Sequence, residues 1–414
     1  MADGSTTLNA VAGKGYFLDT NAGTIDVNLP TSPTRGDTIV LADYGNNFAT
    51  NRVIVNTGGK LIDSVVGGDP GSSGFTIDTN GAVVELVFAD DTAGWIIKQN
   101  NVPSDLGAES YIKYVTATGG TVTTSGDYKT HVFTGDGCFV VSCAGNPAGS
   151  ATLDYVVIAG GGGGGYGDGG GGGAGGFRLS NSYSIPAPTM SPLVNPTGIT
   201  ASAQTYPITV GGGGSGGINP NGLATAGGVS TFGPITSAGG GRGAGYSPCN
   251  PVSTIGGPGG SGSGSSGPAP VGLGNTPPVS PPQGNNGGVG GPGAAGGGGG
   301  AGGVGGGTTG PQAGGAGGIG SYISDTFFGP TAPSYGTPGP VGSTRYFAGG
   351  AGGYGDVTFG PGPSAGGGGQ GSSGPTSGTA GTANTGGGGG TGKPSASGFA
   401  GGSGIVMIRY KFQN

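Results

Sequence analysis

The chain has 414 residues, of which 112 are glycine, 13 are Lys or Arg and 19 are Asp or Glu, and its formal net charge is −6. An average soluble domain has about 7% glycine and about 25% charged residues, so this chain inverts the usual balance. No apolar run reaches 18 residues and no cluster of Lys and Arg occurs, which excludes a membrane-spanning helix and argues against a nucleic-acid partner.

Glycine and charge are distributed unevenly along the chain. Residues 1–159 hold 22 glycines and have a net charge of −9, from 7 basic and 16 acidic residues. Residues 160–404 hold the other 90 glycines and only seven charged residues. The sequence therefore joins an ordinary globular part to a second part of a different physical kind.

Residues 1–98 alternate short β-rich runs with turn signals such as Asn80-Gly81. In the run 24–29, Ile25, Val27 and Leu29 alternate with polar residues, which gives a strand with one buried and one wet face. Several such runs at short spacing predict an all-β domain, β-sandwich-like in form. We expect it to anchor the chain and to support oligomerisation, because it starts the chain and carries most of the acidic charge. The expected strands are 15–19, 24–29, 37–41, 52–55, 75–78, 82–88 and 94–97.

Two apolar strands are expected to bracket the glycine-rich region. Residues 99–110 have the composition of a linker, and a second β segment follows over 111–159. That segment ends in an apolar run at 153–159 that leads directly into glycine, and the chain closes with a second apolar run in 405–414. We expect Val156–Ile158 and Val406–Ile408 to pair in one sheet, so that 160–404 leaves this sheet and returns to it.

The glycine runs of 160–404 are not collagen, which requires glycine at every third residue. The run 296–300 breaks that rule. Glycine chains can also adopt the extended threefold helix of the polyproline II region, and without side chains neighbouring backbones can bond to each other. We expect a lattice of such helices, stabilised by inter-segment backbone bonds of about 1 kcal/mol each. A disordered linker is the alternative that this composition allows.

The residues that flank the glycines resemble a known family. The opening 154–165 (DYVVIAGGGGGG), the closing 401–410 (GGSGIVMIRY) and the upstream 125–133 (SGDYKTHVF) resemble the signatures of phage glycine-rich fibre domains. The resemblance spans about 111–410 and extends to T-even-type adhesins, in which polyglycine helices pack in layers and variable loops form a receptor-binding tip. Residues 13–98, with LPTSP at 29–33, resemble a module of marine phage structural proteins. The resemblance implies a virion location, and fibres of this kind are commonly homotrimers.

No motif supports catalysis, a cofactor or a metal site. The match of 387–393 to a phosphate-binding loop fails because Pro394 replaces the required Ser or Thr. The repeated GGYGD at 164–168 and 352–356 is interpreted as two tight turns rather than as a calcium repeat. The single histidine, His131, is expected to be structural, and the three cysteines, Cys138, Cys143 and Cys249, are expected to be free thiols. Paired carboxylates for glycan cleavage are not singled out by spacing.

Binding to a host surface is therefore the expected role, and the insertions that interrupt the glycine runs are the candidate contacts. These insertions are 178–209, 246–255, 276–286 and 322–347. The last has the densest aromatic content, and aromatic side chains with arginine commonly anchor recognition surfaces. We expect its side chains to be exposed at a loop tip, with coverage of the lattice ends as the alternative. The candidate receptor-contact residues are Tyr322, Phe327, Phe328, Tyr335, Arg345, Tyr346 and Phe347.

Three functions fit the sequence. The first is a non-enzymatic tail-fibre adhesin that binds a host protein or glycan, with residues 1–98 attached to other virion proteins. The second is a structural capsid or head fibre, or a decoration protein, without receptor recognition. The third is a non-viral glycine-lattice protein that binds ice or another surface, although the threonines are too scattered to form a regular face. The N-terminus shows no signal peptide, which is consistent with assembly in a host cytoplasm.

Overall fold

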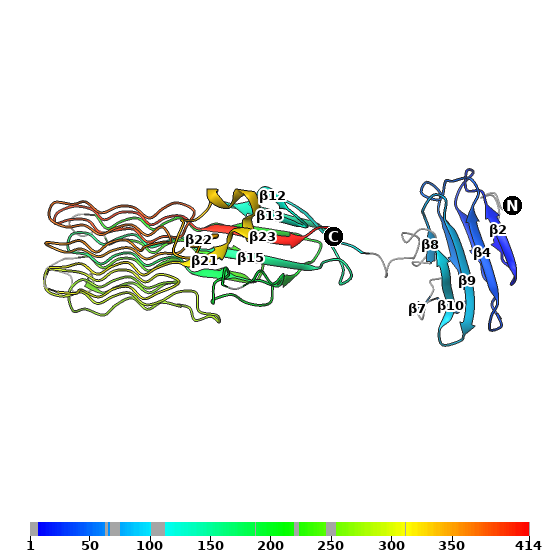
Figure 1. The fold of residues 1–414 in the computed structure, drawn as a ribbon, viewed down its shortest axis with the longest axis horizontal. Coiled ribbons are helices and arrows are strands. Elements are labelled where there is room, and N and C mark those ends of the chain that lie inside the picture. Colours follow the sequence, from blue (N-terminus) through cyan, green and yellow to red (C-terminus); the bar gives the residue numbers. More distant parts are fainter. Residues whose placement is uncertain are drawn as a thin grey trace. The chain divides into compact units, whose positions relative to one another are not determined.

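The computed structural model describes residues 7–62, 65–66, 75–100, 112–186, 188–218, 223–245, 254–310 and 312–413. The chain divides into two compact units, Met1–Ile112 and Lys113–Asn414 (Figure 1). Each unit has its own hydrophobic core, and each is described by itself below.

The first unit is a sandwich of two sheets around one core, as the alternating sequence pattern predicts. Successive strands β1 to β5 alternate between the sheets, so β1, β3 and β5 are parallel neighbours and β2 is parallel to β4. Side chains of Ile25 and Val27 are buried in the core, whereas Asp26 is not, which confirms the predicted alternation. The strands of the first sheet are β1 (Leu8–Asn9), β3 (Ile25–Asn28), β5 (Val53–Asn56) and β8 (Phe75–Ile77). Those of the second are β2 (Lys14–Leu18), β4 (Thr38–Asp43), β9 (Val83–Asp90), β10 (Gly94–Asn100), β6 (Leu61–Ile62) and β7 (Val65–Val66).

The second unit begins with two sheets that pack face to face around aromatic and aliphatic side chains. The first sheet has the order β11 (Val115–Thr118), β14 (Gly137–Ala144), β18 (Thr205–Thr209), β19 (Ser230–Phe232) and β20 (Ile235–Ser237). The second, called the central sheet, has the order β12 (Thr121–Ser125), β13 (Tyr128–Phe133), β23 (Ile405–Lys411), β15 (Thr152–Ile158) and β16 (Phe177–Leu179), and β17 (Ile199–Thr200) also pairs with β15. A hairpin of β21 (Ser321–Ser324) and β22 (Thr344–Phe347) encloses the helix α1 (Asp325–Phe328) and the 3-10 helix η3 (Gly329–Ser334).

The two apolar strands that flank the glycine region pair as predicted. Strand β23 lies between β13 and β15 and is antiparallel to both. Its pairing with β15 places Val156 opposite Met407 and Val157 opposite Val406. The C-terminal strand therefore completes a sheet whose other strands all precede residue 201, and the chain between residues 200 and 405 leaves this sheet and returns to it.

Strand β10 extends to Asn100, two residues into the expected linker, and the rest of that linker lies outside the described residues. The segment 111–159 is not a separate domain, because its strands share both sheets of the second unit with later strands. Cys138 and Cys143 are free thiols, as expected, and Cys249 lies outside the described residues. Among the described residues, no helix is long and apolar enough to cross a membrane.

The glycine segments extend from one end of these sheets as a stack of wavy, extended chains (Figure 1). Segment 160–165 shows how they bond: its successive amides donate to segments 223–229, 398–404 and 169–176 and then repeat that order. Its successive carbonyls accept from segments 238–245, 211–217 and 386–392 in the same repeating order of three. A rotation of bonding direction every three residues is the property of a threefold, polyproline II-type helix, which makes no internal hydrogen bonds. Each central helix is therefore surrounded by six others.

Glycine is required in this lattice because the helices touch backbone to backbone. At each residue of 160–165, an added Cβ would lie closer than 3.0 Å to the backbone of a neighbouring segment. The same holds at Gly298, where the nearest atom would be the carbonyl oxygen of Gly172. Inter-segment backbone bonds thus replace the hydrophobic core that the composition lacks, and the lattice is ordered rather than a disordered linker.

Candidate binding surface at the distal end of the lattice

The aromatic insertion 322–347 is not an exposed loop tip, which corrects the sequence-based expectation. Its hairpin and α1 pack on the side of the central sheet that faces away from the first sheet (Figure 1). Phe327, Phe328 and Phe347 are fully buried and Tyr346 is 3% exposed. Tyr322 and Tyr335 are partly buried, and the Tyr335 ring packs against Phe328 with a centroid distance of 6.0 Å.

The reason for this burial lies in the central sheet itself. Strands β15 and β23 are apolar on both sides, so each side of the sheet needs a cover. Tyr155, Val157 and Ile408 face the first sheet. Val156 and Met407 face the opposite way, where Phe327, Phe328 and Phe347 cover them. The aromatic residues of this insertion therefore complete a core.

Arg345 also has a structural role in this insertion. Its Nε donates to the carbonyl of Tyr335 at 2.6 Å, and its Nη2 donates to the carbonyl of Gly336 at 3.1 Å. A guanidinium that holds the backbone of its own loop in this way has fewer donors left for a partner. None of the seven candidate residues is therefore exposed at a loop tip, where the sequence predicted a receptor contact.

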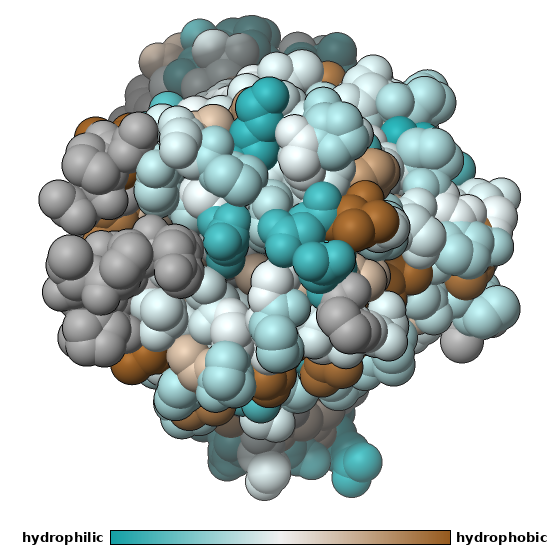
Figure 2. Space-filling model, turned by 90° about the vertical axis from the view of Figure 1, so that its left-hand side faces the viewer, coloured by the Kyte–Doolittle hydropathy of each residue, from teal (hydrophilic) through white to brown (hydrophobic). Residues whose placement is uncertain are grey.

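The free end of the lattice is formed by other segments. Because each helix runs the length of the lattice, successive turns alternate between the sheet end and the opposite end, which we call the distal end. Backbone bonds link the distal turns to one another: the amide of Gly167 donates to Ala396, that of Asp356 to Gly293, and that of Val357 to Gln312. Figure 2 shows this end face-on, with hydrophilic and hydrophobic side chains interspersed. The distal turns described are 166–168, 267–269, 291–293, 309–310 with 312, 356–358, 373–376 and 393–397.

Glycine in the left-handed conformation reverses the chain in three of these turns. Gly167, Gly267 and Gly293 have φ values of 60°, 60° and 64°. This region is disfavoured for residues with a Cβ, so these glycines fix tight reversals between neighbouring helices. The insertion 276–286, by contrast, turns at the sheet end, where the carbonyl of Gln283 accepts from Phe177 of β16. Residues 246–253 of another predicted insertion lie outside the described residues.

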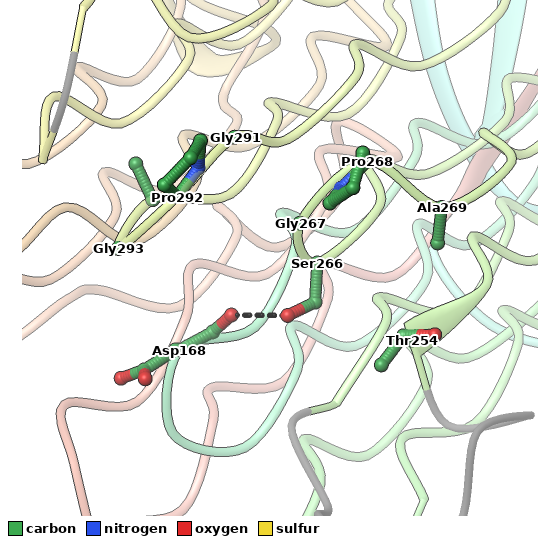
Figure 3. A pocket seen from close by; sticks show the side chains of 10 residues that line it. Asp168, Thr254, Ser266, Gly267, Pro268, Ala269, Gly291, Pro292 and Gly293 are labelled. Carbon is green, nitrogen blue, oxygen red and sulfur yellow. Dashed lines mark hydrogen bonds between the residues drawn. The ribbon is translucent and has the colours of Figure 1, made fainter.

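Three distal turns line an open pocket of about 470 Å³ (Figure 3). Asp168 lies on one side, the 291–293 turn on a second and the 267–269 turn on a third. At its base the Ser266 hydroxyl donates to the backbone carbonyl of Asp168 at 2.8 Å, which ties two of the turns together. The lining residues are Asp168, Thr254, Ser266, Gly267, Pro268, Ala269, Gly291, Pro292, Gly293 and Ala294.

The repeated GGYGD motif places two carboxylates at the same end of the lattice. The hydroxyl of Tyr354 donates to Oδ1 of Asp356 at 2.6 Å. Burial raises the pKa of Asp168, and the nearby charge of Asp356 raises it further. Each motif copy ends in a distal turn, and the sequence predicted tight turns at both copies. The sequence did not show that their carboxylates come within electrostatic reach of each other.

The described residues hold no cluster of side chains suited to a metal ion. Groups of three or more His, Cys, Asp and Glu side chains that could hold a metal do not occur among them. His131 is fully buried, with Nδ1 2.6 Å from the carbonyl of Gly119 and Nε2 3.0 Å from the hydroxyl of Tyr410. Because a carbonyl only accepts, Nδ1 carries the proton and Nε2 accepts from Tyr410. Burial lowers the pKa of His131, so the ring is a neutral structural group.

Comparison with protein families agrees with this architecture. A family profile described as a glycine-rich domain matches residues 134–411. The chain belongs to this glycine-rich domain family. The match starts in the loop before β14 and ends within β23, so it covers the lattice together with strands of both sheets that support it. No curated protein matches the chain.

The sequence did contain a signal for the distal turns of the glycine-rich domain. Strand β15 leads outward into the lattice, so the first reversal, 166–168, must be distal and the next must return to the sheets. The reversals at 267–269 and 291–293 each carry a Gly-Pro pair, which marks a turn. Counting turns from the strand would have placed these at the distal end and 322–347 at the sheet end.

Proposed function

We propose that this glycine-rich protein is a non-enzymatic bacteriophage virion fibre that attaches the particle to a host cell through the distal turns. The observation that carries the proposal is the way the lattice is built. Its cohesion comes from backbone bonds, so the side chains at the distal turns are not needed for a core. A rigid support that ends in turns free to vary is suited to recognition.

The first unit supports the proposal by being a separate compact body with its own core. We assign to it the attachment to other virion proteins and the formation of a homo-oligomer, most simply a trimer. Its excess of acidic residues contrasts with the sparse charge of the lattice, so the two units present chemically different surfaces. The resemblance of 125–133, 154–165 and 401–410 to phage fibre signatures supports the virion assignment.

Adsorption competition tests this function. The purified full-length chain, added to host cells before the phage, should occupy the receptor and reduce the rate of phage adsorption. Val357, which is 70% exposed on a distal turn, provides a test position, and Val357→Asp should weaken the competition. Val304, which is 65% exposed near the sheet end of the lattice, provides a matched control, and Val304→Asp should compete as the unchanged protein does.

Two results would contradict the proposal. If the unchanged protein neither binds cells nor slows adsorption, attachment through this chain is wrong. If Val304→Asp weakens competition and Val357→Asp does not, the contact lies away from the distal end. Immunogold labelling of virions separates a tail fibre from a head fibre, because the gold would mark different parts of the particle.

A further inference from the structure

The pocket at the distal end has the size and construction of a small-ligand site. Its volume of about 470 Å³ falls within the range of roughly 300 to 1,000 Å³ typical of such sites. Its walls come from three separate turns, each with a left-handed glycine that fixes the reversal. The bond from Ser266 to Asp168 joins two of these walls (Figure 3). Backbone geometry and this hydrogen bond therefore hold the three turns in place before any ligand binds.

The lining combines hydrogen-bonding groups with small apolar surfaces. Gly267, Gly291 and Gly293 contribute backbone to the lining, and Thr254 and Ser266 add side chains with hydroxyl groups. Pro268 and Pro292, both exposed, contribute apolar rings. A purely apolar ligand would desolvate the polar groups without replacing their bonds, which is costly. A ligand with many hydroxyls and one apolar face satisfies both parts of the lining.

Charge narrows the ligand class further. Asp168 lines the pocket, and Asp356 lies close enough to affect its ionisation. Oδ1 of Asp168 is buried and accepts no hydrogen bond from the described residues. The negative charge of these two carboxylates would repel an acidic ligand. Lys393, the basic residue of the 393–397 turn, is not among the lining residues.

We propose that this pocket binds a neutral saccharide of one or two hexose units, with its hydroxyls toward the glycine backbone and hydroxyl side chains and its apolar face on the prolines. This inference rests on the proposed attachment function, since it names the part of a host surface that the distal turns would recognise.

Saturation-transfer NMR on the full-length chain tests the proposal directly. The probes are glucose, galactose, mannose, N-acetylglucosamine and their common disaccharides, with N-acetylneuraminic acid as the acidic comparison. At least one neutral sugar should give saturable transfer, and the acidic sugar should bind at least several-fold more weakly. Gly267→Asn should reduce the affinity at least tenfold. An added Cβ at Gly267 would meet no atom within 4 Å, and asparagine tolerates this left-handed conformation, so the side chain would occupy the open space at the rim.

A matched control exists in the same unit. Gly126, in the turn between β12 and β13, has a φ of 56° and also has no atom within 4 Å of an added Cβ. Gly126→Asn should leave saccharide binding unchanged. If Gly267→Asn lowers the melting temperature, Pro268→Ala, which removes an exposed ring, replaces it and should weaken binding several-fold.

The sugar-binding and adsorption experiments together distinguish a failure of the saccharide proposal from a failure of the attachment proposal. Absence of saturable transfer from every neutral sugar would overturn the saccharide proposal, and so would equal binding by the Gly267→Asn and Gly126→Asn chains. If the unchanged chain still blocks phage adsorption in that case, attachment stands and the recognised partner is a protein. If neutral sugars bind the pocket but the chain does not bind cells, the saccharide site stands and attachment fails.

Discussion

Gly298 provides the sharpest test of the backbone lattice. Its amide donates to the carbonyl of Ala351 at 2.7 Å, and its carbonyl accepts from the amide of Gly318 at 2.9 Å. A Cβ at this position would overlap the carbonyl group of Gly172 on a third helix. The substitution Gly298→Val places a branched side chain where no space exists, so one of the two helices must move.

The cost follows from the bonds that the displaced helix makes. Segment 169–176 donates from Gly171, Gly172, Gly173 and Ala174 to three different neighbours. Losing two to four such bonds at about 1 kcal/mol each costs about 2–4 kcal/mol. Replacing a glycine restricts the unfolded chain, and this stabilises the folded state by about 0.4–1 kcal/mol. The net destabilisation is about 1–4 kcal/mol, which lowers the melting temperature of a unit of this size by roughly 2–6 °C.

Differential scanning calorimetry of the full-length chain measures this shift. The matched control is Gly212→Val, because an added Cβ at Gly212 meets no atom within 4 Å and this residue lies on an exposed helix of the same lattice. Gly212→Val should melt within about 1 °C of the unchanged chain. A Gly298→Val chain that melts as the control does would refute the backbone-contact reasoning and restore the disordered-linker interpretation.

Three further predictions follow from the second unit. Deleting residues 405–414 removes β23 from between β13 and β15, so the product should be insoluble or rapidly cleaved by protease, and a soluble, resistant product would contradict the sheet closure. Phe328→Ala should cost about 3–5 kcal/mol of stability in chemical denaturation, as expected for a buried ring, and a change below 1 kcal/mol would contradict its place in the core. The stability of the second unit should fall as the pH drops below about 6.5, because the pKa of His131 is lowered by its burial and by Lys129, so the unfolded chain takes up the proton first. Urea denaturation between pH 7 and pH 5.5 measures this slope; it should be lost in His131→Phe, and a slope unchanged in that variant would assign the effect to other groups.

The sequence by itself determined the division into two regimes, the β-rich runs and the pairing of the two apolar strands. These depend on local pattern: alternation in 24–29 specifies a strand with one buried side, and glycine runs without a three-residue repeat exclude collagen. The threefold helix was also predictable, because chains without side chains can bond to one another in any direction around their axis.

Tertiary structure alone decided which distal turns become neighbours and which surface the aromatic residues cover. The rings of 322–347 resemble a recognition loop in composition, and only the position of that hairpin beside the central sheet shows that they cover Val156 and Met407. Likewise, Asp168 and Asp356 are 188 positions apart in sequence, and only the stacking of the helices brings them within electrostatic reach. In a lattice held by backbone bonds, many helices have nearly the same sequence. Their neighbours are therefore set by the path of the chain and not by side-chain complementarity, which is why the site could not be assembled from sequence.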